Sequence, residues 1–236
     1  MSQTPIDGPF QVGFLVYANV TQLDVTGPYE VLSKMRGAEM WLIGKTGAPL
    51  RADSGFTISP TSTFVDCPQL DLICVPGGEG VASLLTDAET LAFLRKQSLK
   101  ARYVTSVCTG ALLLGAAGLL KGRRATTHWM AMEFLDAFGA IAVDERVVVD
   151  GNVITGGGVT AGIDFGLQVV AEVAGEAMAR AIQLGIEYDP HPPFDSGHPR
   201  VADAALVERM MSRLSQRQAD RRAEVEKAAA VLDFPG

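Results

Sequence analysis

The sequence predicts an α/β protein whose central sheet is mostly parallel and carries helices on both faces. Short β-branched or apolar runs alternate with longer helix-forming segments, which is the pattern of consecutive βαβ units. The run Asp71–Val75 is almost continuously apolar, as expected for a strand that is buried on both faces. With 236 residues, 47% of them hydrophobic and 20% charged, the chain is long and apolar enough for one compact domain with a sizeable core.

The first half of the chain is expected to contain three parallel strands and the helix that connects the first two. The predicted strand, helix and second strand are Gln11–Tyr17, Asp24–Met35 and Glu39–Gly44. Residues Arg51–Val65 alternate polar and apolar side chains among turn formers, which favours short antiparallel strands or a hairpin. The apolar strand Asp71–Val75 then runs directly into Pro76-Gly77-Gly78.

The second half of the chain is expected to continue the alternation. A helix is predicted over Asp87–Leu99, followed by the β-branched strand Arg102–Val107 and, after Cys108, a helix of small apolar residues. The turn sequence Asp150-Gly151-Asn152 predicts a hairpin within Arg146–Thr155. A further helix is expected over Ala161–Ala174, after a glycine-rich turn.

The C-terminal segment has a different character, and we expect it to form a helical extension. Apolar residues recur there at helical spacing, in the two sets Val207, Met210, Met211, Leu214 and Val225, Ala228, Ala229, Leu232. Between these sets, Ser215–Arg222 is polar and basic, which we interpret as a solvated helix face. We therefore predict an α/β domain over residues 1–199 and an extension over residues 200–236, packed on the domain or on a second subunit.

Charge and composition exclude several classes of function. A net charge of −7 disfavours a nucleic-acid surface, which needs a clustered basic face. No apolar stretch approaches the roughly 18 residues of a membrane span, and the first residues have neither the basic nor the apolar region of a secretory signal. Three irregularly spaced cysteines fit neither a disulfide framework nor a zinc site. We expect a cytoplasmic protein without metal or other cofactor, and without nucleic-acid or membrane partners.

Cys108 is the strongest candidate for a catalytic residue. It lies between the predicted strand Arg102–Val107 and the helix that begins near Thr109, so its sulfur is expected on a tight strand-to-helix turn beside the positive end of a helix dipole. Such an environment favours the thiolate, which is the nucleophilic form of cysteine. Cys67 and Cys74, in a loop and inside a buried strand, are interpreted as structural residues.

Two further features follow strands that are expected to end at the same edge of the sheet as Cys108. Asp24 comes after the first strand, where it is either the N-cap of a helix or a carboxyl group placed against the sulfur. Gly77 and Gly78 follow the strand Asp71–Val75 and are expected to offer backbone N–H groups to an oxyanion or substrate. Ligands of parallel α/β sheets bind at this edge, so these residues are candidates for one site.

His128 is the histidine expected nearest the sheet core. The sequence around it favours a hydrogen-bonded structural role over that of the base in a cysteine–histidine dyad. Gly156-Gly157-Gly158 lacks the spacing of a phosphate-binding loop, so we assign it no cofactor.

The stretches around these residues resemble a known superfamily. Thr105-Ser106-Val107-Cys108-Thr109-Gly110-Ala111, with Pro76-Gly77-Gly78 upstream, is similar to the ThiJ/PfpI superfamily. That resemblance implies a flavodoxin-like sandwich, of the class I glutamine-amidotransferase type, with a reactive elbow cysteine. Gln22–Pro28 and Arg124–Trp129 look like the branch that hydrates isonitriles, and the similarity extends from about Gln11 to about Phe194.

The resemblance implies a specific reaction and a homodimer. The substrate would be a small-molecule isonitrile, R–N≡C, which is hydrated to an N-substituted formamide. Cys108 would attack the terminal carbon and Asp24 would deliver a proton, giving a thioimidate that water hydrolyses. Thr109 would hold the pocket geometry, and Gly77 and Gly78 would contribute N–H groups. No cofactor is expected, because the isonitrile carbon already accepts a nucleophile.

Two other functions fit the same residues. One is a redox or stress sensor, since an accessible cysteine of low pKa is readily oxidised. The other is a small-molecule-binding regulatory protein, because the same stretches resemble the sensor domain of AraC-type transcription regulators. Those regulators carry a long C-terminal helix-turn-helix region, and we expect the tail of this chain to be too short for one.

Overall fold

A seven-stranded, mostly parallel sheet forms the centre of the protein, in a computed structural model that describes residues 8–232. Its strands lie in the order β10-β11-β7-β6-β1-β2-β5, and all neighbours are parallel except β10 and β11. Their bounds are β1 Phe10–Leu15, β2 Ala38–Gly44, β5 Ser62–Thr63, β6 Leu72–Val75, β7 Tyr103–Val107, β10 Val147–Asp150 and β11 Val153–Gly156. The predicted fold class, a flavodoxin-like α/β sandwich, is confirmed.

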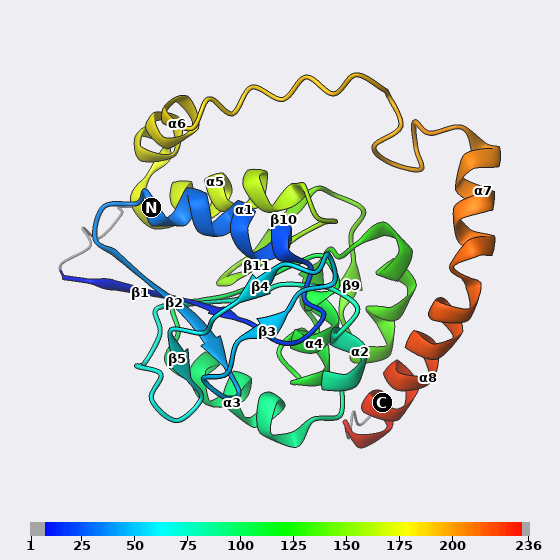
Figure 1. Ribbon diagram of the computed structural model, residues 1–236, viewed down its shortest axis with the longest axis horizontal. Helices are drawn as coiled ribbons and strands as arrows, with labels where there is room; N and C mark the ends of the chain where they lie inside the picture. The colour runs from blue at the N-terminus through cyan, green and yellow to red at the C-terminus, as the bar shows by residue number, and fades with distance from the viewer. Residues whose placement is uncertain (1–7, 233–236) are drawn as a thin grey trace.

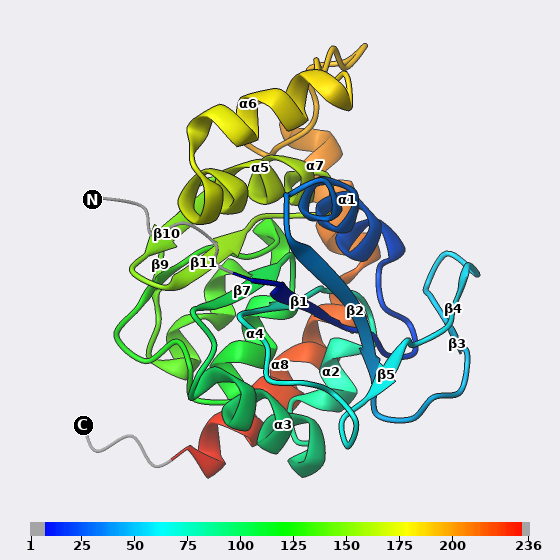
Figure 2. The same cartoon turned by 90° about the vertical axis from the view of Figure 1, so that its left-hand side faces the viewer.

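Helices cover both faces of this sheet (Figures 1 and 2). One face carries α1, α5 and α6, and the other carries α2, α3, α4 and α8 (Figure 2). The bounds of the first seven are α1 Gln22–Ser33, α2 Val81–Leu84, α3 Ala88–Ser98, α4 Gly110–Ala116, α5 Ala161–Ala174, α6 Glu176–Gly185 and α7 Ala204–Arg213. The observed α5 has the predicted bounds, whereas α2 and α6 did not stand out in the sequence.

Small residues allow α1 and α5 to pack closely. A Cβ on Gly166 would lie 2.9 Å from Cβ of Val31, and a Cβ on Gly162 would lie 2.9 Å from Cδ of Pro28. Glycine at these two positions therefore lets the backbone of α5 approach α1. This contact holds the first turn of α1, which carries Asp24, at a fixed place beside the sheet.

The elements outside the main sheet and its covering helices are short. The predicted antiparallel pair within residues 51–65 is present as β3 (Leu50–Arg51) and β4 (Thr57–Ile58), while β5 joins the main sheet parallel to β2. Beyond α4, a two-stranded parallel pair and two 3₁₀ helices precede the β10–β11 hairpin. They are β8 Arg124–Ala125, η1 Trp129–Phe134, η2 Asp136–Phe138 and β9 Ile141–Ala142.

The C-terminal segment wraps around the domain. Residues 187–203 form an irregular strap from α6 to α7, which continues into α8 (Ser215–Val231) along one side of the molecule (Figure 1). Val225 and Ala228 of α8 are buried, and α8 packs on α2, α4 and η2. By contrast, α7 buries none of its residues. The division of the chain at residue 199 stays a prediction. Across residues 8–232, no helix is both long and apolar enough to cross a membrane.

Candidate active site

Cys108 lies on a tight turn between β7 and α4. Its φ angle is +56°, in the left-handed region that costs a residue with a side chain about 1 kcal/mol. Two hydrogen bonds hold it there, from its N–H to the carbonyl oxygens of Gly156 (3.0 Å) and Gly157 (2.9 Å). Gly110 is needed just beyond the turn, because a Cβ there would lie 2.0 Å from the carbonyl oxygen of Val75. The backbone thus stores strain at the one cysteine predicted to be reactive.

Contacts with neighbouring segments also hold this turn in place. The Thr127 hydroxyl donates a hydrogen bond of 2.7 Å to the Cys108 carbonyl oxygen. The backbone N–H groups of Thr109 and Val159 both interact with the sulfur, and Val159 itself has a φ of +32°. Cys108 is only 5% exposed, so little of its surface is in contact with solvent.

Asp24 is fully buried beside the Cys108 side chain. Its Oδ2 accepts a hydrogen bond of 3.0 Å from the N–H of Gly77, and Oδ1 has no partner with hydrogen-bond geometry in the described part of the chain. Burial raises the pKa of Asp24 to about 7, and the bonds to Gly77 and to the Cys108 thiol only partly oppose that rise. The structure therefore brings together the two side chains that the sequence placed at one sheet edge.

Cys108 and Asp24 act on each other as a coupled pair. Burial and the Asp24 charge raise the pKa of the Cys108 thiol, although the N–H groups of Thr109 and Val159 oppose this. The direction is opposite to our expectation from the helix dipole, because burial and a nearby carboxylate outweigh the local dipole. The resting sulfur therefore holds its proton, with the Asp24 carboxyl group beside it.

Gly77, Gly78 and Thr109 form the frame around this pair. The N–H of Gly78 donates to Oγ1 of Thr109 (3.0 Å), as the N–H of Gly77 does to Asp24. Our expectation that both N–H groups face an oxyanion is therefore corrected: both are already committed to side chains of the site. A Cβ on Gly77 would lie 2.5 Å from the nitrogen of Thr109 and 2.9 Å from Oδ2 of Asp24, so only glycine fits there.

A cavity of about 220 Å³ opens above Cys108. Its walls come from the loops around the elbow and, unexpectedly, from the C-terminal helices. The lining residues from those helices are Met210, Leu214, Arg217, Gln218 and Arg221. The predicted solvated face over Ser215–Arg222 is exposed except at Arg217, Gln218 and Arg221, which are half-buried against this cavity. Helical spacing indicates that a face exists, but it does not indicate which surface that face covers.

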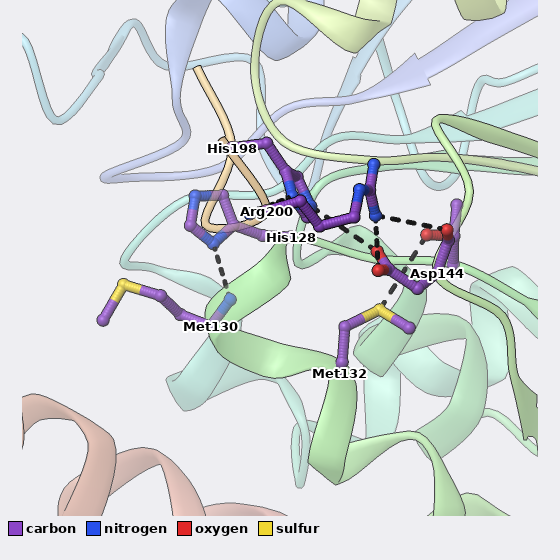
Figure 3. Close-up of polar contacts among 7 residues, drawn as sticks. His128, Met130, Met132, Asp144, His198 and Arg200 are labelled. Carbon is purple, nitrogen blue, oxygen red and sulfur yellow. Dashed lines mark hydrogen bonds and ion pairs between the residues drawn. The ribbon is translucent and has the colours of Figure 1, made fainter. Parts of the chain in front are cut away.

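His128 borders the cavity and is also held by a structural hydrogen bond. Its Nδ1 accepts a bond of 3.2 Å from the N–H of Met130, which caps η1 (Figure 3). Burial, followed by the charges of Arg221 and His198, lowers the pKa of His128 to about 4, so the ring is neutral near pH 7. The hydrogen bond at Nδ1 agrees with the structural role predicted for His128. The same residue also lines the Cys108 cavity.

A second cavity of about 290 Å³ lies on the other side of His128. The strap closes it through an ion-pair cluster, in which His198 and Arg200 contact the Asp144 carboxylate (Figure 3). The Nε2 of His198 is 3.5 Å from Oδ1 of Asp144. The cluster fixes the course of the strap beside the site.

The two other cysteines lie outside both cavities. Burial raises the pKa of Cys67 to about 11 and that of Cys74 to about 12. Their thiols therefore keep their protons near pH 7. Within residues 8–232, no group of three or more histidine, cysteine, aspartate or glutamate side chains is arranged to hold a metal ion.

The fold and the elbow cysteine define the class of protein, and the chain belongs to the DJ-1/PfpI family, whose model matches residues 11–172. An isonitrile hydratase of Pseudomonas putida is 51% identical to it over 224 residues, covering 95% of this chain and 98% of the relative.

A second group of relatives shares only the domain. The transcriptional regulator GbdR of Pseudomonas aeruginosa is 29% identical over 189 residues, which cover 77% of this chain and 51% of the regulator. Among solved structures, a ThiJ/PfpI family protein from Pseudomonas syringae superposes with a TM-score of 0.90 at 43% identity, over 92% of this chain and 91% of that one. The predicted resemblance to this superfamily is confirmed.

Proposed function

We propose that this protein is an isonitrile hydratase that converts R–N≡C and water into the formamide R–NH–CHO. The observation that carries the proposal is the buried pair of Cys108 and Asp24, of which Cys108 lines a small cavity. The near full-length similarity to the Pseudomonas putida isonitrile hydratase supports the same reaction. Because the isonitrile carbon already accepts a nucleophile, the proposed steps need only side chains and water.

In the first step, Cys108 adds to the terminal carbon of the isonitrile. The Asp24 carboxylate takes the proton from Sγ, the sulfur forms a bond to carbon, and an electron pair develops on that carbon. Asp24 then returns its proton to the carbon, which gives a thioimidate, R–N=CH–S–Cys108. The raised pKa of Asp24, about 7, suits a group that must both accept and donate this proton.

In the second step, water hydrolyses the thioimidate. Asp24 accepts one proton from the water as its oxygen adds to the thioimidate carbon, and then passes this proton to the nitrogen. Cleavage of the carbon–sulfur bond releases the formamide, and the proton of the added hydroxyl group passes through Asp24 to the sulfur. One water molecule is consumed and both residues return to their starting state, so the cycle balances.

Thr109, Gly77 and Gly78 are proposed to position the reacting pair. The bond from Gly77 to Oδ2 orients the Asp24 carboxyl, which leaves Oδ1 directed to the proton transfer. The bond between Gly78 and Thr109 holds the start of the elbow helix against the loop that follows β6. Gly77 and Gly78 are thus proposed to position Asp24 and Thr109, instead of offering free N–H groups to the substrate as the sequence suggested.

The cavity wall supports a neutral, apolar R group. Trp129, Met210 and Leu214 contribute apolar surface to the cavity that Cys108 and Thr109 also line. An isonitrile is linear at its reactive end, so the carbon reaches the sulfur while the substituent remains against the apolar wall. Small aryl and alkyl isonitriles are therefore the substrates to test first.

We also propose that the protein is a cytoplasmic homodimer. Large apolar side chains are exposed on α6 and the strap, where Leu184 is 83%, Phe194 79% and Val201 52% exposed. Exposed apolar surface of this kind is typical of an interface between subunits. Three free cysteines suit a reducing compartment. Sedimentation equilibrium tests the dimer, and a mass equal to one chain at micromolar concentration would contradict it.

The test of the function is turnover of p-nitrophenyl isocyanide by the purified protein and by Cys108→Ala. Formamide is measured by absorbance and identified by mass, and Cys67→Ala is the matched control that removes a thiol outside the cavity. We expect turnover by the wild type and by Cys67→Ala and none by Cys108→Ala. No formamide from folded, reduced wild-type protein with several aryl and alkyl isonitriles would overturn the proposal.

A further inference from the structure

The helix α8 is docked firmly beside the candidate active site. The side-chain amide of Gln218 donates a hydrogen bond to the carbonyl oxygen of Met130 in η1. Arg222 forms an ion pair of 2.7 Å with Glu133 of the same 3₁₀ helix, and Val225 is buried. These contacts fix the first half of α8 over the wall that His128 and Trp129 contribute to the cavity.

This docking makes Arg221 one of the residues that line the cavity containing Cys108. Arg221 is half-buried, and its Nη1 donates a hydrogen bond of 2.6 Å to Oε1 of Gln218. Because Gln218 is itself bonded to Met130, the guanidinium is held through a chain of hydrogen bonds that starts at η1. Its position therefore follows from the fold and is not that of a free surface side chain.

Arg221 lacks the carboxylate partner that a sheltered cation usually has. Its neighbours on α8 are both paired, Arg217 with Glu79 and Arg222 with Glu133, whereas no ion pair involves Arg221 in the described residues. Removing a charge from water is unfavourable unless an opposite charge compensates for it. An unpaired cation that lines the same cavity as a nucleophile can therefore stabilise negative charge that develops there.

We propose that Arg221 is a further active-site residue, whose guanidinium stabilises the negative charge that develops on the Cys108 sulfur. When the Sγ proton moves to Asp24, the negative charge moves from the carboxylate to the sulfur, and a cation in the same cavity favours that transfer. The remaining environment opposes it, since Asp24 and the burial of Cys108 both disfavour the thiolate. Arg221 supplies positive charge where the elbow itself supplies only two N–H groups.

The electrostatic influence of Cys108 reaches Arg221. Burial lowers the pKa of Arg221, whereas the charge of Cys108 raises it, as expected for two groups that share one sheltered space. The other charged or titratable groups that line the cavity are Asp53, Glu79, His128 and Arg217. Of these, Arg217 and Glu79 neutralise each other, and His128 is neutral near pH 7.

The inference rests on Cys108 as the nucleophile of the proposed function, but its test needs no isonitrile. The rate at which iodoacetamide alkylates Cys108 is measured between pH 6 and pH 10, from the mass of the tryptic peptide 103–121. Below its pKa the thiol reacts in proportion to the fraction of thiolate, so the ratio of the rates of two proteins at one pH gives the difference between their apparent Cys108 pKa values. The variants are Arg221→Gln, Arg221→Lys and the matched control Arg222→Gln, which removes the adjacent α8 arginine outside the cavity.

We expect Arg221→Gln to raise the apparent pKa of Cys108 by about one unit, which slows alkylation about tenfold at pH 8. Arg221→Lys should retain most of the wild-type rate, because it keeps the charge, and Arg222→Gln should behave as wild type. An unchanged pH profile in Arg221→Gln would overturn the inference. Equal shifts in Arg221→Gln and Arg222→Gln would also overturn it, since the cause would then be a loosened α8. A protein that shows the expected shift but no turnover would refute only the hydratase.

Discussion

Ionisation of Asp24 lowers the free energy of unfolding above neutral pH, and the variant Asp24→Asn measures the size of this effect. Burial raises the pKa of this carboxyl from an ordinary value of 3.8 to about 7, so the folded state binds the proton more tightly than the unfolded state does. The stability that this protonation contributes is fully present below about pH 4 and is lost as the pH rises through 7. At 1.36 kcal/mol for each pH unit, ionising Asp24 in the folded protein costs about 4 kcal/mol at pH 8.

Asparagine occupies the same space but does not titrate, so the variant escapes this penalty. The introduced side chain can still accept the hydrogen bond from Gly77 through its amide oxygen. Relative to wild type, we expect Asp24→Asn to gain about 3 kcal/mol between pH 5 and pH 8, because part of the penalty is already present at pH 5. For a chain of this size, that gain raises the midpoint of thermal unfolding by about 6 to 12 °C.

The assay is urea unfolding at pH 5, 6.5 and 8, followed by circular dichroism. Asp195→Asn, an exposed aspartate in the strap, is the matched control and should show no such dependence on pH. The same Asp24→Asn variant should lose turnover, since it can neither take nor return the thiol proton. If the difference in unfolding free energy between Asp24→Asn and wild type is the same at pH 5 and pH 8, Asp24 does not have the raised pKa on which the proposed chemistry depends.

Three further predictions concern the elbow and its frame. Because the Cys108–Asp24 pair must lose one proton before attack, kcat/KM should rise with pH through about 7 and then level off, and a profile that falls across this range would refute the pairing. Gly77→Ala should lower turnover at least tenfold by displacing Asp24, while Gly47→Ala, whose Cβ would meet nothing closer than 3.9 Å, should leave it unchanged in the same assay. Cys108→Gly should be more stable than Cys108→Ala by about 1 kcal/mol in urea unfolding, because glycine adopts a φ of +56° without strain, and equal stabilities would show that the elbow is relaxed.

Much of the fold could be predicted because its signals are local. The predicted helix over Ala161–Ala174 has the observed bounds, and the hairpin around Asp150-Gly151-Asn152 forms β10 and β11. The mutual approach of Asp24 and Cys108 also follows from a general rule, since parallel strands end at one edge of the sheet. These inferences required only residue patterns and the rule that the carboxyl ends of parallel strands share one edge of the sheet.

Features that depend on distant contacts could not be predicted in the same way. The N–H groups of Gly77 and Gly78 bond to Asp24 and Thr109, and no local pattern indicates where a turn N–H will find its acceptor. The pKa of Cys108 rises although a helix dipole alone would lower it, since burial and Asp24 are contributed by other elements. Likewise, Arg221 belongs to a basic stretch that resembles a solvated surface until α8 is seen to cover the cavity.

The central claim is that Cys108 forms a covalent thioimidate during hydration of an isonitrile, and trapping this adduct tests it most directly. Wild-type protein and Cys108→Ala are mixed with excess p-nitrophenyl isocyanide, quenched with acid within one turnover, and digested for mass spectrometry. We predict that peptide 103–121 of the wild type gains the mass of one isonitrile, that the gain disappears as formamide accumulates, and that Cys108→Ala shows neither product. Formamide production by Cys108→Ala at the wild-type rate, with no adduct on the wild-type peptide, would contradict covalent catalysis by this residue.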